Sequence, residues 1–138
     1  MENTATVPAS PLSENQVQTW SVLAQLAHFL NYVIPVAGLV SLILIYAIMG
    51  KQSERLRENT KAAMNLEITF WIICAAGFVI IIASPTFSYD PIMRVVGVGA
   101  GVGLMLTYTL YRLIFSIINA VNVANGKMAN YGLSLKFL

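Results

Sequence analysis

The chain has 138 residues, of which 57% are hydrophobic and only 10% are charged, and its mean hydropathy is +0.72. Soluble domains carry about a quarter charged residues, so this composition excludes an ordinary soluble protein and predicts one small membrane domain. The net charge of +2 is small and the basic residues are scattered, which excludes a nucleic-acid partner. The one cysteine, Cys74, has no partner for an internal disulfide.

The chain is predicted to begin with a polar leader, residues 1–18. This segment has no Lys or Arg ahead of an apolar core, which excludes a standard signal peptide. Terminal segments of this kind are poorly ordered unless other parts hold them, so we expect a flexible leader. Residues 19–126 are predicted as one helical membrane domain. Residues 127–138 are predicted as a C-terminal tail that is extended or lies on the surface.

The first helical pattern covers residues 15–29. Its polar residues recur at helical spacing and therefore share one face; they are Gln18, Ser21, Gln25 and His28. This pattern predicts a short interfacial amphipathic helix. Pro35 removes a backbone hydrogen bond and clashes one turn back, so a break is expected there and the first transmembrane span follows at 32–49. Whether the stretch before Pro35 spans the membrane or lies on it is left open.

Two longer apolar runs follow the first span. The second span is predicted at 62–83, ended by Ser84 and Pro85 because proline disfavours helix at the residue before it. Its polar start, residues 53–61, is expected to be helical as well. The third span is predicted at 95–123 and is followed by the helix-stop pair Asn125 and Gly126. The fold class is therefore all-α, with three transmembrane helices after the interfacial helix.

The positive charges predict an orientation. Residues 50–61 hold four of the eight basic residues, and loops rich in Lys and Arg stay in the cytoplasm. With three spans, this first loop and the C-terminus would be cytoplasmic and the N-terminus external. The expected location is the bacterial inner membrane.

Glu67 and Arg112 are the charges most clearly inside apolar runs. At about 1.5 Å per residue, both lie roughly 10 Å from the same membrane boundary, and ionised groups in a bilayer usually face protein, water or a partner charge. This favours a Glu67–Arg112 pair. Two alternatives remain: both side chains snorkel to the membrane edge, or Glu67 belongs to a proton or ion pathway.

Small residues line the third predicted span at Gly97, Gly99, Gly101 and Gly103. Their order does not fit the G-x-G-x-x-G pattern of dinucleotide sites. It does place small residues one turn apart, which lets helices approach closely in lipid. His28 is the only histidine, so a metal site is not expected, and we expect it to form a hydrogen bond at the interface or between helices.

Two segments resemble blocks of a known family. They are residues 57–65, RENTKAAMN, and residues 125–138, NGKMANYGLSLKFL; His28, Pro35 and Gly38 are similar to the opening segment of the same family. It is a small bacterial membrane-protein family of unknown function, related to the small Tic subunit (Tic20-like) of the chloroplast inner-envelope import translocon. The resemblance implies no catalytic residues, and its plastid relatives imply protein translocation.

The expected function is non-enzymatic: an accessory or scaffold subunit of a larger inner-membrane complex. The alternative is an oligomeric channel or a translocation component resembling the plastid import family. We expect no catalytic, cofactor-binding or metal-binding residues and no cofactor. The expected partners are the lipid bilayer and other membrane-protein subunits. The structural or interaction residues are His28, Pro35, Glu67, Gly97, Gly99, Gly101, Gly103 and Arg112.

Overall fold

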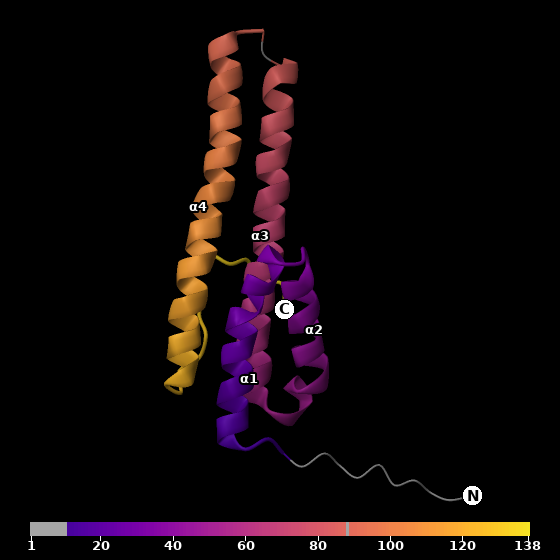
Figure 1. Cartoon of the computed structure of the whole chain (residues 1–138), viewed down its shortest axis with the longest axis vertical. Helices are drawn as coiled ribbons and strands as arrows, with labels where there is room; N and C mark the ends of the chain where they lie inside the picture. The colour runs from indigo at the N-terminus through magenta and orange to yellow at the C-terminus, as the bar shows by residue number, and fades with distance from the viewer. Residues whose placement is uncertain (1–10, 88) are drawn as a thin grey trace, which may run out of the picture.

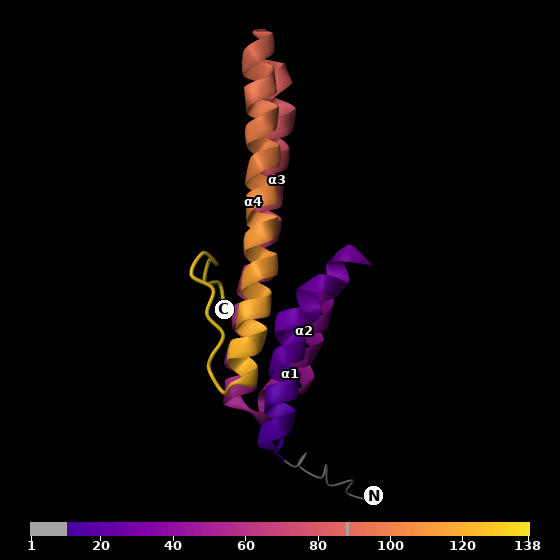
Figure 2. The ribbon, with the colours of Figure 1, turned by 60° about the vertical axis from the view of Figure 1, so that its left-hand side comes forward.

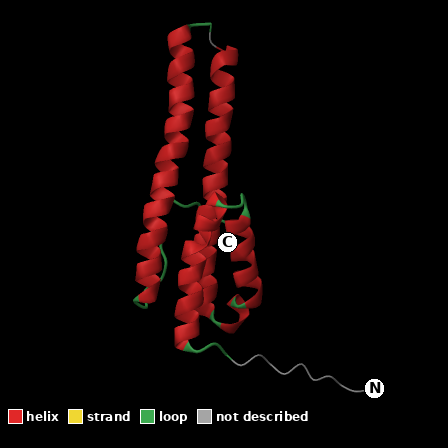
Figure 3. Ribbon diagram, in the orientation of Figure 1, coloured by secondary structure: helices red, strands yellow, loops and turns green. Residues whose placement is uncertain are grey.

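The computed structural model describes residues 11–87 and 89–138, and the regular elements in these ranges are all helices (Figure 3). In chain order they are α1 (Glu14–Leu26), the 3₁₀ helix η1 (Ala27–Tyr32), α2 (Ala37–Ile48), the 3₁₀ helix η2 (Gly50–Gln52), α3 (Glu54–Phe87) and α4 (Pro91–Ala124). The all-α prediction is therefore confirmed for the described residues. α1 begins inside the range 1–18 predicted as leader, and residues 1–10 lie outside the described part.

Helices α3 and α4 form one long antiparallel hairpin (Figures 1 and 2). Each has 34 residues, about 51 Å at 1.5 Å per residue. Among the described residues, these are the two helices long and apolar enough to cross a membrane. α3 begins in the charged segment and runs without a break into the apolar one, as predicted. It passes through Pro85 to Phe87, so the predicted stop at Ser84 and Pro85 is wrong by one turn. Lipid favours this continuation, since only helical backbone satisfies its own hydrogen bonds there.

The elements before α3 form a second, shorter hairpin. α1 and η1 run alongside the lower half of α3, the chain reverses over residues 33–36, and α2 returns (Figure 1). The predicted break at Pro35 is therefore present, and the turn places Val36 at a φ of 70°. α2 has only 12 residues, about 18 Å, against the roughly 30 Å of a bilayer core. The third transmembrane helix, predicted at 32–49, is not confirmed.

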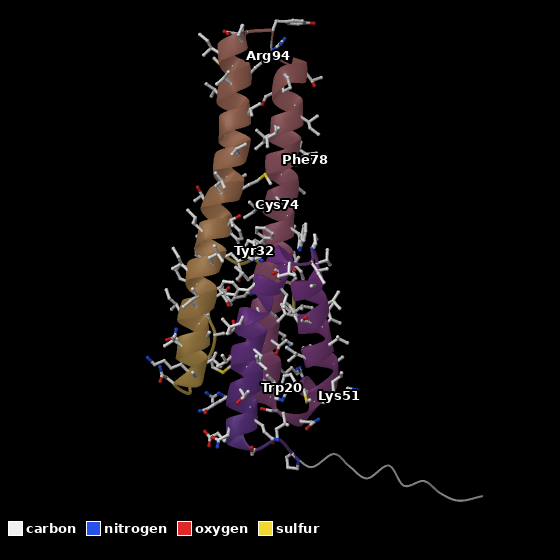
Figure 4. All side chains as sticks on the ribbon, in the orientation of Figure 1. Trp20, Tyr32, Lys51, Cys74, Phe78 and Arg94 are labelled. Carbon is white, nitrogen blue, oxygen red and sulfur yellow. The ribbon has the colours of Figure 1, made fainter. Side chains whose placement is uncertain are left out.

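The short hairpin also decides which chain segments share an end of the molecule. The start of α1, η2 and the end of α4 lie together at the lower end, and the α3–α4 turn lies at the upper end (Figure 1). Lys51 and Arg94 mark these two ends (Figure 4). The predicted topology placed the N-terminal side and the first loop on opposite faces of the membrane, and it is not supported. α1 and η1 run up and α2 runs back down, so the first loop lies at the end where α1 starts.

Packing divides the molecule into a lower bundle and an upper hairpin. In the lower bundle, α1 and α2 close on α3 around small and medium apolar residues; the buried ones are Val17, Ala24, Ala27, Leu42, Ile45, Leu56 and Ala63. In the upper hairpin, α3 and α4 have only each other, and Phe78, Val79 and Val95 are largely exposed. Exposed apolar side chains on long helices indicate a lipid-facing surface.

Candidate functional site

The lower bundle buries an unusual number of polar side chains. Buried polar groups require hydrogen-bond partners, and these face one another across α1, η1, α3 and α4. They are Ser21, Gln25, His28, Asn59, Thr60, Asn65, Glu67, Thr69, Arg112, Ser116 and Asn119. The polar face of α1, predicted to lie on the membrane interface, points instead into this polar core. Sequence periodicity identified that face but not what it meets.

Glu67 is the centre of this polar core and is fully buried. His28 donates from Nδ1 to one carboxylate oxygen at 2.6 Å, and Asn31 donates from Nδ2 to the other. Asn31 in turn accepts from the backbone N–H of Gly38 through Oδ1 at 2.6 Å. One carboxylate on α3 thus fixes η1 and, through Asn31, the start of α2. Asn31 carried no distinguishing sequence signal, because its role depends on the chain reversal that follows it.

Gly38 itself is needed where α2 approaches η1. A Cβ at this position would lie 2.8 Å from the carbonyl oxygen of Ala27 and 2.8 Å from Oδ1 of Asn31. Any side chain would push α2 away from the hydrogen bond that orders it. The close approach therefore requires glycine.

Arg112 approaches the same carboxylate from α4. Its Nη1 lies 3.7 Å from Oε1 of Glu67, its Nη2 donates to the backbone carbonyl of His28 at 2.8 Å, and its guanidinium lies over the Phe70 ring at 4.0 Å from the centroid. The two residues proposed to pair from their matched depths are thus neighbours. Arg112 is 1% exposed, which does not fit the alternative in which it snorkels to the membrane edge.

The charges of Glu67, His28 and Arg112, here called the charged junction, nearly cancel. Burial lowers the pKa of the His28 imidazole, and this effect exceeds the opposing influence of Glu67. His28 is then uncharged at neutral pH, with the proton on Nδ1 because a carboxylate only accepts. The single negative charge of Glu67 faces the single positive charge of Arg112. Several buried atoms have no hydrogen-bond partner among the described residues, including Nε2 of His28, Oγ of Ser116, and Nε and Nη1 of Arg112.

A second layer of hydrogen bonds ties α1 to α3 and to the tail. Gln25 donates to the backbone carbonyl of Asn59 at 3.0 Å, and Asn59 donates to Ser21 at 3.3 Å. The phenol of Tyr131 donates to Gln25; burial raises the pKa of Tyr131, so the phenol keeps its proton. Polar residues of the predicted interfacial helix therefore serve as internal links.

The C-terminal tail, residues 127–138, lies along the lower bundle, turns over residues 132–134, and is held by side chains of α3 and α4. The Asn59 side chain accepts a hydrogen bond from the backbone N–H of Ala129 at 2.8 Å. The Thr69 hydroxyl accepts one from the N–H of Leu135 at 2.9 Å. The Asn65 side chain accepts hydrogen bonds from the N–H groups of Phe137 and Leu138. Asn119 and Tyr111 hold Asn130 and Leu133 in the same way. The sequence predicted a segment that is extended or lies on the surface. It did not predict these hydrogen bonds, because sequence periodicity carries no information on such contacts.

The four glycines of α4 divide into two pairs. A Cβ at Gly97 would meet the side chain of Ser84, and one at Gly101 would lie 2.7 Å from the carbonyl oxygen of Gly77. Cβ atoms at Gly99 and Gly103 would meet nothing within 4 Å. Close helix contact within the chain therefore uses Gly97 and Gly101. Contact of Gly99 and Gly103 with another chain stays a prediction.

A metal centre has no support in the described residues, where no group of three or more His, Cys, Asp and Glu side chains gathers. The fold and the polar core define a class: a small helical protein with two candidate membrane spans and a buried charged junction. The chain belongs to the magnetosome magnetite crystal formation protein family, MamF/MmsF, whose model matches residues 16–138. No curated protein and no solved structure matches this chain.

The family match corrects the resemblance described from the sequence. The Tic20-like assignment is wrong, since nearly the whole chain matches the MamF/MmsF family model instead. The short blocks that carried the resemblance lie in the first part of α3 and in the C-terminal tail. The family and the two apolar helices together indicate a bacterial membrane location and a small magnetosome membrane protein involved in magnetite formation.

Proposed function

We propose that this chain is a non-catalytic scaffold subunit, which holds other membrane proteins in place during magnetite formation. The observation that carries the proposal is the contrast between the buried, hydrogen-bonded cluster of Glu67, His28, Asn31 and Arg112 and the exposed apolar hairpin above it. Glu67 and its three neighbours hold both hairpins together, while the upper halves of α3 and α4 expose apolar side chains over several turns. Such a hairpin offers a long surface to membrane helices of partner subunits.

The chemistry of the polar core also favours a structural role. Both oxygens of Glu67 already accept hydrogen bonds, one from His28 and one from Asn31. A general acid or base must instead reach a substrate atom at hydrogen-bond distance. Partners of the scaffold are proposed to be other subunits of the same membrane.

The test is purification of the tagged full chain from magnetosome membranes in a mild detergent, with crystal size and shape measured in the strain lacking it. We expect stoichiometric membrane-protein partners and altered crystals in the deletion strain. Complementation with Glu67→Gln then separates scaffold from enzyme. If that variant assembles with its partners, it should restore normal crystals. A correctly assembled variant that leaves the crystals altered, or a chain that purifies alone, would overturn the proposal.

A further inference from the structure

A cleft of about 320 Å³ lies beside the polar core, between η1, α3 and α4. Aromatic rings of Tyr32, Phe70 and Trp71 form much of its wall, Cys74 and Met105 continue it, and Arg112 contributes the charged group. Tyr32 and Cys74 lie near the level where the short hairpin ends (Figure 4). The cleft therefore sits where the lower bundle meets the lipid-facing hairpin, within reach of molecules dissolved in the membrane.

Arg112 has hydrogen-bonding capacity that the protein leaves unused. Its Nη2 donates to the carbonyl of His28, but Nη1 lies 3.7 Å from Glu67, beyond hydrogen-bond distance. Neither Nη1 nor Nε has an acceptor among the described residues, and both are buried. An unsatisfied buried donor costs about 1–3 kcal/mol. A small shift of the guanidinium that brings these donors to an acceptor in the cleft would remove that cost.

The charge balance selects the kind of acceptor. Glu67 and Arg112 neutralise each other, and His28 is uncharged at neutral pH. A carboxylate or phosphate in the cleft would add a second negative charge near Glu67, without a further cation among the residues that line it. An uncharged carbonyl oxygen accepts the same hydrogen bonds without this repulsion. The remaining wall suits a flat or aliphatic apolar body.

We propose that this cleft binds the carbonyl head of an uncharged membrane amphiphile. The carbonyl oxygen accepts hydrogen bonds from Arg112, and the apolar body lies against Trp71, Cys74 and Met105. Two membrane sources share this chemistry: an isoprenoid quinone and an uncharged ester lipid. The cleft is large enough for the head group alone, so the chain of either molecule continues into the lipid along the exposed hairpin.

Trp71 provides the readout, because the chain has two tryptophans and the other can be replaced by Trp20→Phe. Purified full-length Trp20→Phe protein in nanodiscs is titrated with three quenchers: a short-chain quinone, a brominated monoacylglycerol and a brominated fatty acid at neutral pH. We expect saturable quenching by the quinone or by the monoacylglycerol, whichever is the source, and only linear quenching by the fatty acid. Cys74, the only cysteine, should be alkylated more slowly under the same saturating conditions.

Two matched variants separate the cleft from the bulk lipid. Cys74→Phe fills the cleft and leaves the polar core unchanged, whereas Val79→Phe adds the same ring on an exposed position of the same helix. Binding should weaken by at least about tenfold in Cys74→Phe, equivalent to roughly 1.4 kcal/mol, and stay unchanged in Val79→Phe. Linear quenching by all three compounds, equal responses of the two variants, or tightest binding of the fatty acid would overturn the proposal.

Discussion

The lower bundle and the upper hairpin are held together by different physics, although α3 and α4 run through both. In the lower bundle, buried amides, a carboxylate and a guanidinium specify which element meets which. In the upper hairpin, small residues allow close contact between the helices, as at Gly77 and Gly101. Directional hydrogen bonds favour one arrangement of the helices. Apolar contacts are less selective in a membrane, because lipid tails are as apolar as the side chains that they would replace. The lower bundle should therefore be sensitive to single polar changes and the upper hairpin to changes of size.

The largest effect is expected from separating Glu67 and Arg112. Removing one partner of a buried ion pair leaves an uncompensated charge and costs about 3–5 kcal/mol. Glu67→Gln and Arg112→Gln should each lower the free energy of unfolding, measured in detergent by denaturant titration. Because the two groups interact, the double variant should cost less than the sum of the single ones. Strictly additive losses would show that the 3.7 Å contact contributes no coupling.

A change of size at Gly101 tests the upper hairpin. Gly101→Leu would force side-chain atoms against the carbonyl of Gly77, and overpacking of this kind costs about 1–3 kcal/mol. Gly99→Leu is the matched control, since a Cβ there meets nothing within 4 Å in the chain. The melting temperature of the purified protein should fall in the first variant only. Equal melting temperatures would mean that α3 and α4 do not pack closely at this level.

The attachment of the tail can be tested at Asn65. Its Oδ1 accepts two backbone N–H groups, from Phe137 and Leu138, so Asn65→Leu should release the end of the tail at a cost of about 1–3 kcal/mol. Hydrogen exchange of the tail amides should rise in this variant. Asn65→Asp keeps an acceptor and should retain much of the protection. If both variants exchange at the wild-type rate, another contact holds the tail.

The smallest effect is a dependence on pH through His28. Its pKa is lowered by burial, with Glu67, Arg112 and Tyr131 as the ionisable neighbours, so the unfolded chain binds the proton more readily than the folded one. The free energy of unfolding should fall as the pH drops below about 6.5, by at most about 1.4 kcal/mol per pH unit. His28→Gln should remove this dependence. A stability that rises on acidification would instead show a protonated, paired histidine.

The sequence by itself determined a helical membrane protein, a break at Pro35, and Glu67 and Arg112 at matching depths, because composition, proline and helical rise are local properties. The tertiary structure decided that 37–48 is a short returning helix and that the polar face of α1 turns inward. It also decided that His28 and Asn31 join Glu67, and that Gly97 and Gly101, not Gly99 and Gly103, meet α3. Periodicity reports which residues share a face of one helix, but which neighbour that face meets depends on chain reversals that the pattern does not encode.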